Sequence, residues 1–413
     1  MTTTEEIIKP LSDPEAAGHF KKAGEIADQV MSKLVQQCKP GQKISLLCSR
    51  SDNLILKKLN ALDLDEEITK GISFPTSISF TEMAGYYSPM PGKDIKMIEK
   101  GDLLKIDLGV QINGYSAVVN QSIVVGNSET NPVTGDHAKL LSTGKKIMSE
   151  IIANIRPGVT NTAITKIITD IEKESGVQMV KDVYSHSMEK DIDEGVRLIS
   201  MTGTKESKVE KITFEENEVY TLDVLVTTGN GKLHVSDHRP TIFKREKKRV
   251  HQLGTKAGRQ VLFFVKRNHL DFAFHTKAFK SIDKAWFGCK ECSKVGLFIP
   301  YTTQVGSKNE PIVGFKATIM VLAEETVKVT GIYEPPMFLD LTEKEVEKKD
   351  EKKDEKKDEK NEKKKENEKK KPNNNKGRGK GRGRGRGKGK AKGKGKGRGR
   401  GRGKNKKKKK KKK

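Results

Sequence analysis

The sequence predicts an α+β fold with two similar halves, on the basis of one hairpin and one internal repeat. An Asn-Gly pair at 113–114 is the strongest short hairpin signal and favours a two-residue type I′ turn. It separates two strand-like runs, 103–112 and 115–125. A helical pattern ends at a basic residue followed by Pro-Gly and then resumes, once around 39–41 and again around 156–158. This repeat of helix, break and helix indicates two halves related by pseudo-twofold symmetry.

Apolar residues at three- and four-residue spacing predict the helices of both halves. The pattern is clearest where Ile26, Val30 and Leu34 share one face, and where Ile147 and Ile151 share another. Strand-like runs outside the hairpin complete the predicted antiparallel sheets. The predicted helices span 14–36, 43–60, 137–155 and 160–174, and the further strands span 214–227 and 312–321.

Three segments differ in composition from the rest of the folded domain, which is predicted to span 1–341. Residues 244–298 are basic and mostly helical in pattern, and they interrupt the second half as an insertion. Residues 342–375 form a charged low-complexity linker in which Glu-Lys-Lys-Asp recurs. Like charges four residues apart disfavour a lone helix, so disorder is expected there. In 376–413 Gly alternates with Lys or Arg before a final lysine run, which predicts a disordered basic tail.

The positive charge of the chain is concentrated in this tail. Residues 376–413 hold 23 Lys and Arg and no acid, so the rest carries only +4 of the net charge of +27. A flexible polycation follows phosphates, and without an aromatic residue it binds them without reading sequence. The alternatives are a solubility tail and a nuclear-localisation signal. The arginines expected to contact nucleic acid are Arg378, Arg382, Arg384, Arg386, Arg398, Arg400 and Arg402.

The insertion is a second, weaker candidate for contact with nucleic acid. Its basic residues either form a patch that binds RNA or are the solvated face of ordinary surface helices. The residues concerned are Lys247, Lys248, Arg249, Arg259, Lys266 and Arg267.

The polar, acidic N-terminus predicts no signal peptide, and no apolar run is long enough to cross a membrane. Four cysteines are too few for a disulfide scaffold, which indicates a reduced cytosolic or nuclear protein. Cys289 and Cys292 form a single C-x-x-C without a second pair at zinc-ribbon spacing. Two helix cysteines in the insertion are therefore expected in preference to structural zinc or a redox motif.

The predicted hairpin places a carboxylate beside an apolar residue. In a two-residue turn Ile112 faces Tyr115, Gly109 faces Val118 and Asp107 faces Asn120. Val118 is then the diagonal neighbour of Asp107 on one face of the sheet. Two carboxylates at these positions would bind a shared ion between them. With a valine at one position, only a single carboxylate ligand remains.

Four collinear motifs resemble the type 2 methionine aminopeptidases and, more closely, the proliferation-associated proteins, which are their non-peptidase homologues in peptidase family M24. The motifs are KGISFPTSIS at 70–79, SP at 88–89, GDLLKIDLGV at 101–110 and EVYTLDVLV at 218–226. The resemblance covers about residues 15–337 and implies the pita-bread fold with its helical insertion. It further implies a nucleolar and cytoplasmic protein that binds ribosomes and rRNA and is linked to growth control.

The aminopeptidases hold two divalent ions with two Asp, one His and two Glu, and activate a bound water. Carried over by position, these ligands fall on Asp107, Val118, His186, Asp223 and Lys316. A substrate-binding His falls on Tyr86, and a second one has no counterpart near Glu194. Valine cannot ligate a metal, and the lysine ammonium repels a divalent cation.

Two states of this site remain open from the sequence. In the first, Asp107, His186 and Asp223 hold one ion weakly. In the second, which we favour because buried charges need partners, the two Asp are paired with Lys316. The expected function is a non-catalytic protein without a cofactor that binds RNA and ribosomes. The alternatives are an active aminopeptidase with altered ligands and a nuclear DNA-binding or transcriptional adaptor.

Overall fold

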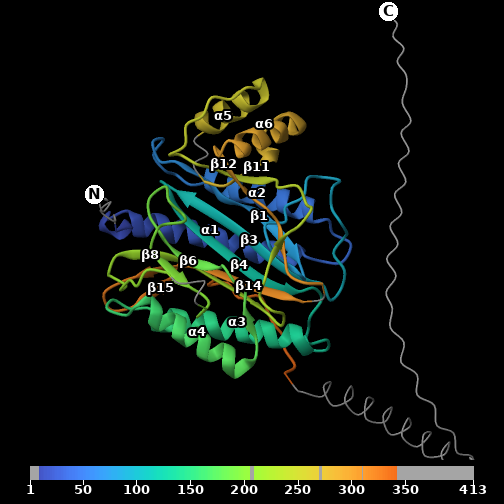
Figure 1. Cartoon of the computed structure of the whole chain (residues 1–413), viewed down its shortest axis with the longest axis vertical. Helices are drawn as coiled ribbons and strands as arrows, with labels where there is room; N and C mark the ends of the chain where they lie inside the picture. The colour runs from blue at the N-terminus through green and yellow to red at the C-terminus, as the bar shows by residue number, and fades with distance from the viewer. Residues whose placement is uncertain (1–8, 205–208, 269–271, 309, 342–413) are drawn as a thin grey trace, which may run out of the picture. The chain divides into compact units, whose positions relative to one another are not determined.

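The computed structural model describes residues 9–204, 209–268, 272–308 and 310–341. Within these ranges the predicted α+β fold is confirmed (Figure 1). A nine-stranded sheet runs through both halves in the order β1-β3-β4-β14-β8-β6-β7, with β15 beside β14 and β5 beside β8. The strands are β1 (Lys70–Phe80), β3 (Leu103–Ile112), β4 (Tyr115–Val124), β5 (Gln178–Met179), β6 (Tyr184–Met188), β7 (Leu198–Ser200), β8 (Glu218–Thr227), β14 (Ile312–Val321) and β15 (Thr326–Lys328).

Two helices from each half pack on this sheet and enclose separate hydrophobic cores. In the first half α1 and α2 cover β1, β3 and β4, and in the second half α3 and α4 cover β8 and β14. The predicted helix limits are confirmed to within two residues, because each break coincides with a Pro-Gly pair or a cap. The helices are α1 (Ala16–Gln37), α2 (Ile44–Asn60), α3 (Gly135–Asn154) and α4 (Asn161–Ser175).

The two halves meet at a seam between β4 and β14 where the strands splay. A single pair of residues, Asn120 and Lys316, is in ladder register across it. Side-chain hydroxyls bridge the rest of the seam. The Val118 N–H donates to Thr318 Oγ1 at 3.0 Å, and the Gly314 N–H donates to Ser122 Oγ at 2.8 Å.

The strand β1 was not predicted, and the predicted strand 214–227 begins only at Glu218. The register of β1 against β3 shifts twice, between Ile72 and Phe74 and between Phe74 and Ser77. Bulges at these places accommodate Pro75, which lacks an N–H for a regular ladder, and they break the two-residue periodicity on which a prediction depends.

The structure confirms helices in the predicted insertion and adds strands, which extend it to 242–301. The insertion contains the helices α5 (Lys256–Arg267) and α6 (Ile282–Lys294), but also a three-stranded sheet of β10 (Ile242–Arg245), β11 (Phe274–His275) and β12 (Phe298–Tyr301). These strands are two to four residues long, too short to show periodicity. They give the insertion its own core around Phe243, Phe274 and Phe298.

One buried histidine connects the insertion to the body. His275 of β11 lies with Nε2 2.9 Å from the carbonyl oxygen of Ser88, and its Nδ1 accepts from the Lys277 N–H. Burial lowers the pKa of His275 to about 3, so the ring is neutral near pH 7. Smaller elements complete the fold: β2 (Met83–Gly85), β9 (His234–Val235) and β13 (Gln304–Val305) form a third sheet, and η1 (Pro10–Ser12) and η2 (Thr276–Ala278) are short 3₁₀ turns.

Helix α1 approaches the chain after β15 very closely at Gly24. A Cβ at this position would lie 2.3 Å from the carbonyl oxygen of Val329. We expect Gly24→Ala to destabilise the protein by about 1–3 kcal/mol in chemical denaturation, because a backbone atom must shift to accept the methyl group. Gly18 in the same helix has open space around it. Gly18→Ala is the control and should be neutral or stabilising; an equal effect at both positions would exclude the steric explanation.

Candidate functional site

The central feature of the site is a row of polar side chains that crosses the sheet. Asp107 of β3 is paired with Asn120 of β4, Asn120 with Lys316 of β14, and Lys316 with Asp223 of β8. Directly paired residues point to the same face of a sheet, so the register alone brings these side chains together. Ser77 of β1 extends the row beyond Asp107.

Lys316 forms ion pairs with the carboxylates on both sides. Its Nζ lies 3.4 Å from Asp107 Oδ2 and 3.1 Å from Asp223 Oδ2. The pairing expected from the sequence is therefore confirmed. Burial raises the pKa of Asp107 in spite of the nearby ammonium, while the two carboxylates raise the pKa of Lys316. Desolvation therefore outweighs the ammonium at Asp107, whereas at Lys316 the two acids outweigh the desolvation that lowers its pKa.

The row leaves two buried acceptors unpaired. The amide of Asn120 donates to Asp107 Oδ2 at 3.2 Å, but Asp107 Oδ1 and Asn120 Oδ1 have no hydrogen-bond partner. Both residues line a cavity of about 310 Å3 together with Tyr86, His186 and Glu194. Both oxygens are themselves buried, and unpaired acceptors of this kind are uncommon in folded proteins.

The predicted site residues His186 and Tyr86 both line the cavity, and burial shifts the pKa of each. His186 of β6 lines the cavity, and burial lowers its pKa, which favours the neutral ring. Tyr86 has a positive φ of 67°, an uncommon conformation for a bulky residue, beside the site. Burial raises its pKa, so its hydroxyl remains protonated.

Val118 lies on the same face of the sheet as Asp107 and Asn120, in an apolar cluster next to the ion pairs. It packs with Phe74, Tyr86 and Tyr301 and with Ile242 of the insertion. The ring centroids of Tyr86 and Tyr301 lie 5.1 Å apart, edge to face. Phe74 lies 5.3 Å from Tyr301. Aromatic side chains from the body and the insertion thus fill the space beside the row.

The insertion also supplies a second half-buried lysine, which was not predicted from the sequence as part of this site. Lys244 of β10 pairs with Asp193 and lies 3.1 Å from Glu194 Oε2. The hydroxyl of Tyr301 donates to Glu194 Oε1 at 3.1 Å. Glu194 lines the cavity, so its carboxylate is neutralised by a residue outside the main sheet.

Among the described residues no three His, Cys, Asp or Glu side chains are grouped as a metal site requires. Cys289 and Cys292 are buried free thiols on α6 and pack in the insertion core. The expectation of two helix cysteines is confirmed. Burial raises the pKa of Cys292 to about 12, so the thiol is unreactive near neutral pH.

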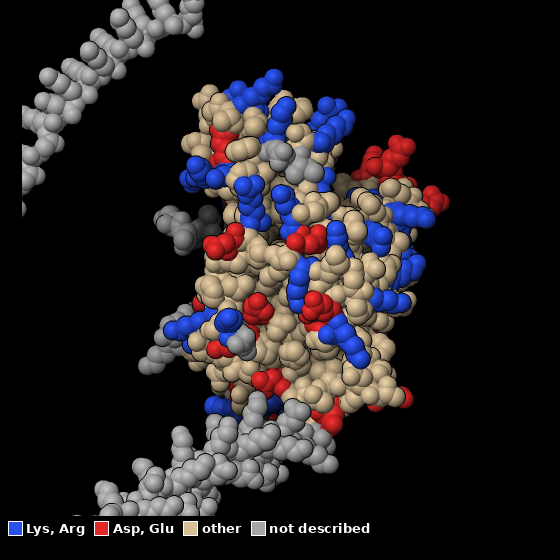
Figure 2. Space-filling view, turned by 90° about the vertical axis from the view of Figure 1, so that its right-hand side faces the viewer, with Lys and Arg blue, Asp and Glu red and all other residues tan. Residues whose placement is uncertain are grey.

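The six basic residues of the insertion that are predicted to contact nucleic acid are all exposed: Lys247, Lys248, Arg249, Arg259, Lys266 and Arg267. Lys and Arg side chains gather over this end of the molecule in Figure 2. The guanidinium of Arg259 is partly committed, because it donates to the carbonyl oxygens of Leu253 and Gly254 at 2.9 and 3.0 Å. The tail residues Arg378 to Arg402 lie outside the described residues. In the described part no helix is long and apolar enough to span a membrane.

Fold and site together define a pita-bread protein of the aminopeptidase type. The model of metallopeptidase family M24 matches residues 18–240. A curved DNA-binding protein of Schizosaccharomyces pombe is 30% identical over 82% of this chain and 88% of its own. Proliferation-associated protein A of Dictyostelium discoideum is 28% identical over 80% and 86%. The solved structure of a thermophilic Arx1 has a TM-score of 0.70 at 21% identity and covers 78% of this chain and 92% of its own. The chain belongs to metallopeptidase family M24 and, within it, to the proliferation-associated branch.

Sequence reasoning missed the contributions of Asn120, Lys244 and Tyr301 to this site. For Asn120 a signal was present, because the hairpin register already placed it opposite Asp107. Lys244 and Tyr301 lie on the first and last strands of the insertion, β10 and β12, and only the docking of the insertion onto the body brings them to Glu194.

We expect Lys316→Met to destabilise the fold by about 3 kcal/mol at pH 7.5, because it leaves Asp107 and Asp223 buried without a cation. A raised carboxyl pKa means that the folded state binds a proton more tightly than the unfolded state. The contribution of such a carboxyl group to the free energy of unfolding is largest below the pKa of an unfolded Asp, about 3.9. This contribution is lost as the pH rises through the pKa of the group in the folded state. The loss of unfolding free energy in the Lys316→Met variant, measured by urea unfolding, should therefore be smaller at pH 4.5 than at pH 7.5.

The matched control is the triple variant Lys316→Met, Asp107→Asn, Asp223→Asn, which removes the whole charged set and should recover most of the lost stability. A deficit that is independent of pH, or is unchanged in the triple variant, would show that Lys316 acts through packing alone.

Proposed function

We propose that this protein is a non-catalytic member of family M24 that binds RNA and ribosomes. The observation that carries the first half of the proposal is Lys316, whose ammonium lies between Asp107 and Asp223 in the row across the sheet. A divalent ion at the same carboxylates would meet a positive charge at close range in a low-dielectric site. The side chains present do not fit a pair of metal ions.

Val118 supports the same proposal by its surroundings. The position that matches the second aminopeptidase Asp is apolar and packs against Phe74, Tyr86 and Tyr301. Restoring a carboxylate there would bury a charge among aromatic rings. The site is thus adapted to a metal-free state at Val118 as well as at Lys316.

The second half of the proposal rests on charge and on resemblance. The six exposed cations of the insertion and the 23 basic residues of 376–413 provide a polycationic surface for phosphates. The resemblance to the proliferation-associated proteins implies roles at the ribosome and in growth control, and a cytoplasmic and nucleolar protein. A fold whose active relatives receive nascent N-termini also suits a place near the ribosomal exit tunnel.

A second candidate function is binding to DNA in the nucleus. It is favoured by one relative, the S. pombe protein named as a curved DNA-binding protein, which shares 30% identity with this chain. Phosphate contacts carry no sequence information and serve either nucleic acid. Crosslinking in cells followed by sequencing of the bound nucleic acid separates the two candidates, since rRNA reads support the first and genomic DNA reads the second.

We expect the purified protein to release no methionine from methionyl peptides in the presence of cobalt, manganese or zinc. We also expect it to bind no stoichiometric pair of divalent ions in calorimetric titration. A type 2 methionine aminopeptidase assayed in parallel is the positive control. Turnover that Asp107→Ala abolishes, or two tightly bound ions per chain, would establish the alternative of an active enzyme with altered ligands.

We expect deletion of 376–413 to weaken ribosome binding by about tenfold or more at low salt and to flatten its salt dependence, because fewer counterions are released. The control is a tail of the same composition in scrambled order, which should bind as the native chain does. Ribosome sedimentation at two salt concentrations measures both effects. If truncation leaves binding and its salt dependence unchanged, the tail is a solubility or localisation segment.

In the truncated protein, charge reversal of Lys247, Lys248, Lys266 and Arg267 tests the insertion separately. Loss of the residual binding supports a contact through these residues, and unchanged binding assigns them to an ordinary solvated surface.

A further inference from the structure

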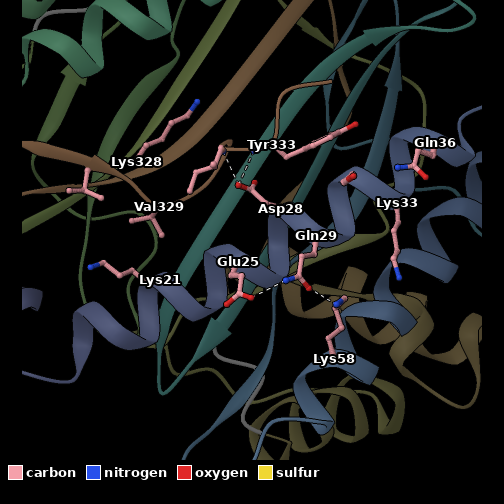
Figure 3. A pocket seen from close by; sticks show the side chains of 13 residues that line it. Lys21, Glu25, Asp28, Gln29, Lys33, Gln36, Lys58, Lys328, Val329 and Tyr333 are labelled. Carbon is pink, nitrogen blue, oxygen red and sulfur yellow. Dashed lines mark hydrogen bonds between the residues drawn. The ribbon is translucent and has the colours of Figure 1, made fainter. Parts of the chain in front are cut away.

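A second cavity, of about 830 Å3, lies along α1 and shares no lining residue with the candidate site. One wall is a stripe of α1 and the other is formed by residues 327–333 (Figure 3). We call this cavity the α1 groove. Its volume is at the upper end of the range of roughly 300–1,000 Å3 that is usual for binding pockets.

The helical wall is polar and long. Lys21, Glu25, Asp28, Ser32 and Gln36 recur at three- and four-residue spacing and so lie on one face of α1. At 1.5 Å per residue this stripe extends for about 22 Å. A groove of this length matches a segment of a partner chain, such as about four turns of a helix.

The opposite wall is apolar and is held in place by Asp28. The carboxylate of Asp28 accepts from the N–H groups of Gly331 and Ile332, each at 2.8 Å, and of Tyr333 at 3.3 Å. Figure 3 shows Asp28 pointing from α1 to this segment. The side chain of Ile332 remains 66% exposed on the resulting wall, next to Val327 and Tyr333. Burial of this apolar surface stabilises a complex only if the partner covers it with apolar groups.

The charges around the groove are mostly positive and in part uncommitted. Lys21 and Lys33 form no ion pair with a residue in the part of the chain that the structure describes. Lys58 bonds to the neutral amide oxygen of Gln29. The acids in the wall are committed, since Glu25 pairs with Lys22 at 2.9 Å and Asp28 is occupied by backbone N–H groups. The groove therefore combines an apolar wall with a cationic rim.

We propose that the α1 groove is a docking site for an acidic amphipathic segment of a partner protein. The segment places its apolar side chains against Val327, Ile332 and Tyr333 and its carboxylates near Lys21, Lys33 and Lys58. An apolar centre within a charged rim is the usual arrangement of a protein interface, and a helix seated in a groove is one of its common forms. A nucleic-acid backbone complements the cations but leaves the apolar wall unused. The proposal is independent of the RNA and ribosome function proposed above.

The test uses the full-length protein and a photoreactive, fluorescein-labelled peptide of about 16 residues, with leucines at helical spacing and glutamates elsewhere. Fluorescence anisotropy measures its affinity, and mass spectrometry locates the crosslinks. We expect crosslinks to α1 and to 329–333, and an affinity at least tenfold weaker for Lys21→Glu/Lys33→Glu and for Ile332→Glu. Lys139→Glu/Lys166→Glu is the matched control, because it changes the net charge equally at exposed helix positions outside the groove. The basic tail contributes equally to both double variants.

Three results would overturn the proposal. The first is equal binding to the two double variants, with crosslinks only to the tail. The second is undiminished binding of a peptide in which every Glu is replaced by Gln, which would remove the role of the cationic rim. The third is protection of the groove lysines from chemical modification by a uridine oligonucleotide but not by the peptide. This result would assign the groove to nucleic acid.

Discussion

The ion pairs of Lys316 are the constraint on which the site depends. Four neighbouring strands each contribute one polar side chain to a single row, and the register of those strands fixes the order Asp107, Asn120, Lys316, Asp223. Three of the four are ionisable, with Asp107 buried and Lys316 and Asp223 half-buried, so none can change alone without leaving a charge or a lone acceptor unpaired. The row stabilises the ion-paired arrangement and at the same time makes it specific to this set of residues.

The surroundings of the row reinforce this arrangement from outside the main sheet. The insertion contributes Lys244 to the carboxylate of Glu194, and it contributes Ile242 and Tyr301 to the aromatic cluster around Val118. His275 fixes the same insertion to the loop at Ser88 through a neutral ring. The insertion is therefore both a carrier of exposed cations and a structural part of the wall of the site. The exposed cations and this part of the wall of the cavity therefore belong to one folded segment.

The parts of the structure that the sequence predicts are those governed by local rules. The Asn-Gly turn determined the hairpin, and with it the pairing of Asp107 with Asn120 and of Gly109 with Val118, which the structure confirms. The four helices of the halves end at Pro-Gly pairs or caps and were predicted within two residues. The meeting of Asp107 with Lys316, 209 positions apart, is not a local property, and it was expected only because a family resemblance aligned both residues with one site. The bulged strand β1 and the short strands of the insertion lack a detectable period, and the docking of Lys244 on Glu194 depends on tertiary packing alone.

The seam between β4 and β14 differs from the rest of the main sheet in how it can change. Ladder bonds join backbone atoms that every residue except proline carries, so ordinary substitutions leave them in place. Apart from the pair of Asn120 with Lys316, bonds at the seam pass through the hydroxyls of Ser122 and Thr318, and exchange of either residue for alanine removes the bonds that its own hydroxyl forms. The connection between the two halves is thus encoded in side chains. Over evolutionary time its strength can be adjusted one residue at a time without rebuilding the strands on either side.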